Sequence, residues 1–509
     1  MPILFLYALP LILILVSHII SVVYEVFVNP SLLRIPGPFL ARFTRLWYFS
    51  RVWNGDFETV NIALHEQYGP IVRISPGHYS ISNHSDVKTV YSVGSSFTKS
   101  AWYDAFKDPS PHEWSVFTDR NNKRHNETRR KFTSLYSMSS VLHYEEFVDK
   151  CANIFTEHLS QFAHSGQSID FHHWLQCYAF DVIGEITFGQ RFGFLDEGKD
   201  IMGALSTVRK LLTYSALIGI YPQWHPRLYK ILGRFTSSGP GSRTFIIGFV
   251  VDKLRRLNEM RSESSHQHPS TKTSKTQDFM ERMAVARDQD PEKINDYHLL
   301  MMGVSNVIAG SDTTAMGLSS IMYHLLRNPN AFRRLRQEID DFTRDQQCST
   351  QITFKESQQM PYLQAAIKEA LRMHSATGLP LWREVPVGGA EINGYSLPEG
   401  AVVGINTWVA HYNEEVFPNP KSFLPERWIE AKSNPLRLRA MNEIYMPFGL
   451  GSRTCLGKHI SILEISRLIP QLIRDFDFVL ENQTWTTENL WFVKPTDFRV
   501  KVSLRNKEI

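Results

Sequence analysis

The sequence predicts a mainly α-helical fold with small β-sheets, an α+β arrangement, and three observations support this expectation. Apolar residues recur with helical spacing in long stretches that end near positions 328, 373 and 468. Shorter alternating runs, broken by prolines and glycines, lie at about 64–91 and 385–403 and are typical of strands and turns. The chain has 509 residues, 43% of them hydrophobic, which is enough to bury one large core.

The first segment predicts a membrane anchor. From Ile3 to about Val28 the chain is nearly all apolar, which is long enough to cross a hydrocarbon core of about 30 Å. A cleaved signal peptide would have a basic start, a shorter apolar run and a small-residue cleavage site, and none is evident. We therefore expect a transmembrane helix at 1–28, a proline-containing hinge at 29–50 and one main domain at 51–509. Basic residues follow the span and none precedes it, so the main domain should be cytosolic.

Composition excludes several classes of function. The net charge of +4 and the pI of about 8.7 are mild, and no basic stripe with interleaved aromatics indicates a nucleic-acid partner. The four cysteines have neither pairing nor metal-site spacing and suit a reducing compartment. Neither a phosphate-binding loop nor a dinucleotide fingerprint is present.

A glycine-rich loop near the C-terminal end holds one cysteine. The run from Phe448 to Gly457 reads Phe-Gly-Leu-Gly-Ser-Arg-Thr-Cys-Leu-Gly and leads into an apolar segment with helical spacing. Glycines permit positive φ and let the backbone approach a flat partner closely. Free amides at the start of the helix and the charge of Arg453 should favour a thiolate at Cys455. From these residues alone, Cys455 is either an anionic ligand or a small buried residue.

Polar residues interrupt three other predicted helices. A long helix is expected from Asn295 or Asp296 to about Asn328, with Ala-Gly-Ser-Asp-Thr-Thr at 309–314 in its middle. Small residues leave room for a ligand there, and threonine hydroxyls can compete for helix hydrogen bonds and open them. Helices expected at 120–136 and 360–373 each carry a polar pair on one face, His125 with Arg129 and Glu369 with Arg372. Such pairs can be ordinary surface features or functional groups.

The pattern F-x-x-G-x-R-x-C-x-G around Cys455 resembles the cysteine-ligand loop of the cytochrome P450 family, the haem-thiolate monooxygenases. The Gly-Ser-Asp-Thr-Thr run resembles the oxygen-activation motif of that family. Glu369 and Arg372 resemble its E-x-x-R pair, and Arg427 in Pro-Glu-Arg-Trp resembles the arginine that completes the set, although the family more often has phenylalanine where this chain has tryptophan. The motifs occur in the family's order. They imply the cytochrome P450 fold, with 51–509 as a haem-thiolate monooxygenase catalytic domain.

The resemblance implies a role for each matched residue. Cys455 would be the axial ligand of the iron in haem b, where a thiolate pushes electron density onto the metal. Thr313 would be the hydroxyl at the oxygen-activation site, and Asp312 would relay protons from solvent. Glu369, Arg372 and Arg427 would shape the core around the haem. The residues expected to surround the haem and hold its propionates are His125, Arg129, Arg383, Arg453, Phe448 and Gly449.

The resemblance also implies partners and a location. Electrons should arrive from NADPH-cytochrome P450 reductase, with cytochrome b5 as a second donor, and the location implied is the endoplasmic reticulum membrane with a single span. Residues 217–224 are either ordinary core or a flap over the substrate entrance that dips into the bilayer. Basic residues that could dock an acidic reductase, or simply be solvated, are Lys123, Arg124, Arg130, Lys131, Lys432, Arg437, Arg439 and Lys458.

Three segments, 37–41, 44–47 and 97–103, resemble the filamentous-fungal group that includes pisatin demethylase. This implies secondary metabolism, with one oxygen atom of O2 inserted into a hydrophobic small molecule. The nearest alternative is a haem-thiolate isomerase or dehydratase that uses no dioxygen, and the intact pair of Asp312 and Thr313 argues against it. An alternative from another class is a non-catalytic haem- or lipid-binding membrane protein, which would show no reductase-dependent turnover.

Overall fold

The computed structural model describes residues 30–110, 112–235, 238–265, 277–345, 351–482 and 484–506. The transmembrane helix expected at 1–28 lies outside these ranges. Within them, no helix combines the length and the apolar character that crossing a membrane requires.

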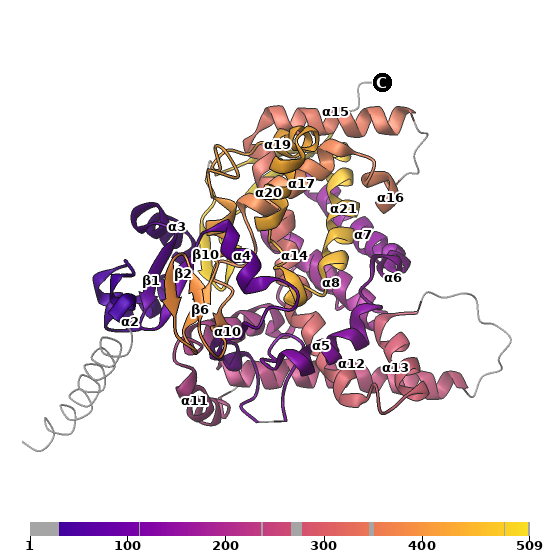
Figure 1. Ribbon diagram of the computed structural model, residues 1–509. Coiled ribbons are helices and arrows are strands. Elements are labelled where there is room, and N and C mark those ends of the chain that lie inside the picture. The colour runs from indigo at the N-terminus through magenta and orange to yellow at the C-terminus, as the bar shows by residue number, and fades with distance from the viewer. Residues whose placement is uncertain are drawn as a thin grey trace, which may run out of the picture.

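Helices make up most of the described chain (Figure 1). The α-helices are α2 (Leu46–Asn54), α3 (Phe57–Tyr68), α4 (His84–Tyr91), α5 (Asn122–Thr133), α6 (Met138–Val141), α7 (Glu145–Ser165), α8 (Phe171–Phe188), α9 (Phe194–Glu197), α10 (Ala204–Ile218), α11 (His225–Leu232), α12 (Gly239–Ser265), α13 (Phe279–Gln289), α14 (Asp296–Arg327), α15 (Pro329–Asp345), α16 (Phe354–Ser357), α17 (Pro361–Met373), α18 (Thr407–His411), α19 (Glu426–Glu430), α20 (Pro435–Ile444) and α21 (Lys458–Asp475). Short 3₁₀ helices include η1 (Pro30–Arg34), η2 (Phe39–Arg42), η3 (Ala101–Phe106), η6 (Pro222–Trp224) and η9 (Gly451–Arg453).

The strands form small sheets, and β1, β2, β6 and β10 lie at one side of the helical body (Figure 1). The largest has the order β1-β2-β8-β5-β3, and the others are β4-β12-β9, β10-β11 and β6-β7. Their bounds are β1 (Ile71–Ser75), β2 (His78–Ile81), β3 (Thr98–Lys99), β4 (Ser168–Asp170), β5 (Arg383–Glu384), β6 (Ala390–Ile392), β7 (Tyr395–Leu397), β8 (Val402–Gly404), β9 (Phe476–Leu480), β10 (Thr487–Leu490), β11 (Phe492–Pro495) and β12 (Arg499–Leu504). The predicted mixture of many helices and small sheets is confirmed.

The predicted β region at 64–91 is too broad, because α3 and α4 occupy its two ends and only β1 and β2 are strands. The prolines and glycines around β1 and β2 indicated strands and turns, and that interpretation was extended to the flanking residues, which form helices. The strands and turns expected at 385–403 are present as β6, β7 and the start of β8.

Helix α14 runs through the middle of the helical body and packs against α8, α12, α17 and α21 (Figure 1). Its start is fixed by Asn295, whose side chain accepts a hydrogen bond from the His298 amide. Its end comes one residue before Asn328, where the following proline stops the helix. The predicted helix is therefore confirmed at both ends. The cysteine loop joins α20 to α21, which also packs on α14.

The segment before α2 is docked on the sheet. Ile35 is fully buried, and the Arg73 amide of β1 donates a hydrogen bond to the Pro36 carbonyl at 2.8 Å. Gly37 adopts φ 159°, and a Cβ there would lie 2.2 Å from the Arg73 carbonyl oxygen, so the close approach requires glycine. Whether 29–50 also acts as a hinge stays a prediction.

Candidate active site

The loop before α21 presents the Cys455 side chain to a large internal cavity. Gly449 and Gly451 have φ of 68° and 62°, conformations that favour glycine, and the Cys455 amide donates a 2.7 Å hydrogen bond to the Phe448 carbonyl. The loop is therefore folded back on itself, and Cys455 lies three residues before the first residue of α21. Phe448, Gly449 and Cys455 all line the cavity.

Opposing influences act on the pKa of the Cys455 thiol. Burial among protein atoms raises this pKa, although the amides of Gly457 and Lys458 and the charge of Arg129 act in the opposite direction. The sequence predicted an anionic sulfur, with Arg453 as the helping charge. A metal ion bound at this sulfur would displace the thiol proton and so favour the thiolate.

The opposite wall of the cavity comes from the middle of α14. Ala309 is exposed, and Gly310 and Thr313 are half-buried, in a helix whose neighbouring residues are buried. All three line the cavity with Cys455. The Thr313 hydroxyl donates a 2.7 Å hydrogen bond to the Ala309 carbonyl, yet α14 continues unbroken, so the local opening expected from these residues does not occur.

Asp312 does not share this wall with Thr313. Its side chain is buried on another side of α14, where it accepts a hydrogen bond from the Gln176 side-chain amide of α8, and it does not line the cavity. The Gln176 carbonyl oxygen in turn accepts a 3.2 Å hydrogen bond from Lys494 of β11. The structure therefore brings Thr313 and Cys455 together and leaves Asp312 outside the cavity.

Four cationic side chains meet on the cavity wall: Lys99, Arg129, Arg383 and Arg453. They come from β3, α5, β5 and the cysteine loop. Arg453 donates to the Asp119 carbonyl and the Asn122 side chain, and Arg383 donates to the Leu381 and Trp382 carbonyls. Within the described ranges none of the four has a carboxylate at hydrogen-bond or ion-pair distance.

The charges in this cluster act on one another. Burial, followed by Arg383, lowers the pKa of Arg453 to about 10. Burial and the three arginines hold the pKa of Lys99 well below its usual range. Burial and Arg453 lower the pKa of His125 to about 4, so its imidazole is neutral near pH 7. Such a cluster needs an anion, because uncompensated buried cations are costly.

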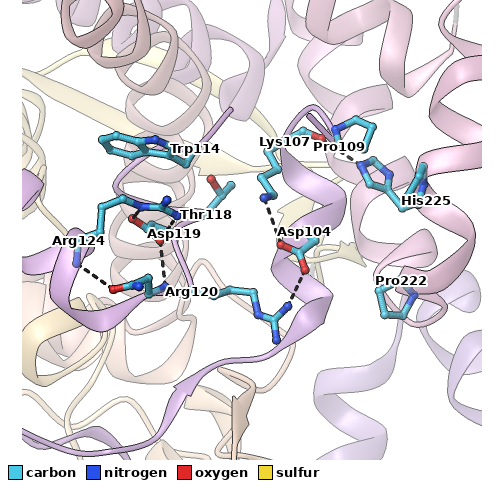
Figure 2. Close-up of a pocket in the computed structure, with 12 residues that line it drawn as sticks. Asp104, Lys107, Pro109, Trp114, Thr118, Asp119, Arg120, Arg124, Pro222 and His225 are labelled. Carbon is cyan, nitrogen blue, oxygen red and sulfur yellow. Dashed lines mark hydrogen bonds and ion pairs between the residues drawn. The ribbon is translucent and has the colours of Figure 1, made fainter. Parts of the chain in front are cut away.

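A neighbouring pocket shows the opposite arrangement (Figure 2). Its volume is about 370 Å³ and it shares Thr118 with the main cavity. Arg120 bonds to Asp104 at 2.8 Å, and Arg124 bonds to Asp119 at 2.7 Å beneath the Trp114 ring (Figure 2). The arginines of this pocket are matched by carboxylates, whereas Lys99, Arg129, Arg383 and Arg453 in the main cavity are free to bind an anion.

The cavity thus joins a cysteine sulfur, a helix wall of small residues and an anion site. A match to the cytochrome P450 family spans residues 36–502. The chain belongs to the cytochrome P450 family. A pisatin demethylase of Fusarium vanettenii is 38% identical over 468 residues, which cover 91% of this chain and 89% of the relative. A cytochrome P450 monooxygenase of Aspergillus terreus is 34% identical, over 88% of this chain and 90% of the relative. The cytochrome P450 monooxygenase cicH of Emericella nidulans is also 34% identical, over 95% of this chain and 96% of the relative.

This P450 is therefore a monooxygenase-type oxidoreductase, and its family implies a haem-thiolate cofactor. The residues present fit that group. A flat macrocycle with two carboxylates suits a cavity that has one cysteine and four cations without carboxylate partners. Cys455 would ligate the iron, and Lys99, Arg129, Arg383 and Arg453 would hold the carboxylates, with His125 beside them.

The E-x-x-R set of the P450 forms a buried network behind the cavity. Arg372 donates to both oxygens of Glu369 at 2.9 and 3.0 Å, and Arg427 donates to Glu369 at 2.9 Å. All three side chains are buried, as the structural role expected from the sequence requires. The indole N–H of Trp428 adds a fourth hydrogen bond to Glu369 at 2.9 Å, which the more usual phenylalanine could not make.

Sequence reasoning missed Lys99 as a member of the site. The residue lies in the run 97–103, which was used only as a marker of the fungal group. Its side chain is buried, donates to the Phe117 carbonyl and lies 4.1 and 3.9 Å from the ring centroids of Tyr103 and Phe117. A lysine in the middle of an aromatic run is the only local signal that it faces inward.

The segment 217–224 is divided between core and surface. Leu217 and Ile220 are buried, and Gly219 lies against Trp102, so this part is core. Trp224 is half exposed.

Proposed function

We propose that this chain uses haem b to insert one oxygen atom of O2 into a hydrophobic small molecule in fungal secondary metabolism. The observation that carries the proposal is the shared cavity of Cys455, Thr313 and the four unmatched cations. When bound, haem supplies the oxygen chemistry, and its thiolate ligand favours O–O cleavage. The protein supplies the sulfur, the carboxylate partners and a lining that is mostly apolar. The relatives named above, two of them called monooxygenases, support the same reaction class.

Within this proposal Thr313 handles a proton. Its hydroxyl oxygen is on the cavity side of α14, and its hydrogen is donated to the Ala309 carbonyl. The oxygen atom can therefore accept a hydrogen bond from a water molecule in the cavity, while the helix carbonyl fixes the hydroxyl's direction. Asp312, held by Gln176 outside the cavity, would have to turn to pass protons on.

Replacing Thr313 by alanine is expected to uncouple the reaction. The variant should bind haem normally but consume NADPH with roughly tenfold less product and release peroxide. General acid–base groups typically contribute 10²–10⁴-fold to the rate, and a water molecule in the place of the hydroxyl can restore part of that contribution. Product, NADPH and peroxide are measured together. Ser319→Ala is the matched control, since Ser319 makes the same 2.7 Å bond to the carbonyl four residues earlier but does not line the cavity. Tight coupling in the Thr313 variant would remove this residue from the mechanism, and NADPH-independent conversion would favour an isomerase.

Replacing Lys99 by methionine is expected to weaken haem retention. A hydrogen bond to a charged group is worth about 1.5–3 kcal/mol, so haem affinity should fall by about tenfold or more. The measurement is the rate of haem transfer to excess apomyoglobin. Lys123→Met, an exposed lysine on α5, is the control and should lose haem at the wild-type rate. Equal rates in both variants would take Lys99 out of the cofactor site.

The electron donor proposed is NADPH-cytochrome P450 reductase, with cytochrome b5 as a second donor. Support comes from basic residues around Cys455. Lys123, Arg130, Lys432 and Lys458 are exposed, whereas Arg439 pairs with Glu443 and Arg124 with Asp119. The exposed set leaves a positive surface for an acidic partner.

We also propose that residues 1–28 anchor the protein in the endoplasmic reticulum membrane with the catalytic domain in the cytosol. The surface near the start of the described chain supports this. Arg45 donates a 3.0 Å hydrogen bond to the Ile220 carbonyl, which brings the start of α2 beside the end of α10. Large apolar side chains exposed on η2, α2, η6, α11 and the turn that follows α11 are Phe39, Leu40, Leu46, Trp53, Trp224, Ile231 and Phe235.

A further inference from the structure

Arg243, near the start of α12, is a buried cation that lines the same cavity and has donors to spare. Its exposed fraction is 7%, and its Nε has no hydrogen-bond partner among the described residues. One Nη donates to the Phe106 carbonyl at 3.5 Å, and the other lies 3.6 Å from a Glu113 carboxylate oxygen. Both distances are long for charge-assisted contacts.

Arg372 shows how a buried arginine is normally satisfied in this protein. Its guanidinium bonds to both Glu369 oxygens and to the carbonyls of His411 and Pro420, all within 3.0 Å. A guanidinium has five N–H donors, and a buried donor that makes no hydrogen bond destabilises the protein. Arg243 therefore has at least one N–H donor without an acceptor in the part of the chain that the structure describes, and a ligand in the cavity can supply that acceptor.

The position of Arg243 separates it from the cations of the haem site. It lies 3.6 Å from Glu113, and the next residue, Trp114, is hydrogen-bonded through its amide and its carbonyl to the hydroxyl of Tyr297, in the first turn of α14. Thr313 comes sixteen residues after Tyr297, about 24 Å along the helix axis. Arg243 thus marks a part of the cavity remote from the oxygen-activation wall.

A cluster of aromatic side chains lines the cavity beside Arg243 and Lys99. Trp491 lies 4.6 Å from Phe106 and 5.2 Å from Phe117, measured between ring centroids, and 4.8 Å from Phe492. These four side chains and Tyr103 all line the cavity. An aromatic ring of a ligand gains more on packing against such a cluster than an aliphatic group of equal area.

We propose that Arg243 is a substrate-binding residue, and that the substrate is a flat aromatic molecule with a neutral carbonyl oxygen at the end remote from the reacting carbon. Glu113 already supplies a negative charge 3.6 Å from the guanidinium, so a neutral acceptor satisfies the free donors without placing two anions at one cation. This inference rests on the proposed function, because it concerns the substrate of that reaction.

The test compares two probes that differ by one oxygen atom. Xanthone is a planar tricycle with a carbonyl, and xanthene has the same skeleton without it. Binding to the haem-loaded protein is measured by calorimetry and by the shift of the haem absorption band. We expect the wild type to bind xanthone about tenfold or more tighter than xanthene, because the carbonyl meets a charged donor. Xanthene-9-carboxylate should bind more weakly than xanthone.

Arg243→Met should remove this preference by weakening xanthone and leaving xanthene within about twofold. Arg243→Lys retains the positive charge but lacks the several N–H donors of the guanidinium, so it should keep a reduced preference for xanthone. It serves as the second variant if Arg243→Met does not fold. An unchanged preference in Arg243→Met, no preference in the wild type, or tighter binding of the carboxylate would overturn the inference. The carbon monoxide spectrum of each protein is recorded first: a wild type without a thiolate-ligated haem would refute the proposed function, whereas a normal spectrum without a xanthone preference would refute only the role of Arg243.

Discussion

Cys455→Ala is expected to abolish turnover and to remove the thiolate signature from the haem spectrum. The sulfur faces the cavity, so its loss leaves no protein atom to ligate the iron from this loop. The fold should survive, because the loop depends on Gly449, Gly451 and the bond from the residue 455 amide to the Phe448 carbonyl, all of which remain. The free energy of unfolding of the cofactor-free protein should change by less than about 1 kcal/mol.

Cys177→Ala is the matched control for this experiment. Cys177 is a buried cysteine of α8 that does not line the cavity. It should retain turnover and the thiolate spectrum. Full activity in the Cys455 variant would mean that another group ligates the iron.

Glu369→Ala is expected to prevent accumulation of the folded enzyme. The substitution leaves Arg372 and Arg427 buried without their shared carboxylate, and breaking such a set typically costs about 3–5 kcal/mol. That is a large fraction of the 5–15 kcal/mol by which domains are usually stable. The measurement is denaturant unfolding of the variant, together with the yield of haem-loaded protein at growth temperature.

Glu430→Ala on α19 gives the control for this loss, because Glu430 is exposed and lies 3.9 Å from Arg437. An exposed pair of this kind contributes about 0–1 kcal/mol, so the control should unfold near the wild-type midpoint. If the Glu369 variant unfolded at the same denaturant concentration as the control, the buried network would not have the structural role given to it here.

The sequence predicted those parts of the site that depend on local motifs. The capping residue Asn295 and the proline after Asn328 set both ends of α14, and fixed offsets around Cys455 and Glu369 identified the loop and the buried network. Each of these depends on residues a few positions apart, where spacing determines geometry.

Orientation and long-range contact could not be predicted in the same way. Asp312 and Thr313 are neighbours, yet about 100° separates successive residues on a helix, and only the packing of α8 against α14 shows that Gln176 draws Asp312 away from the cavity. Lys99 and Arg243 reach the cavity through folding of distant segments.

The most direct test of the central claim is the absorption spectrum of the reduced, carbon monoxide-bound protein in gently prepared membranes. A thiolate-ligated haem has a characteristic red-shifted Soret band, which we expect in the wild type and in Cys177→Ala but not in Cys455→Ala. A folded wild-type protein that instead gave the band of a haem without thiolate, or no haem band at all, would contradict the assignment of Cys455 as the iron ligand.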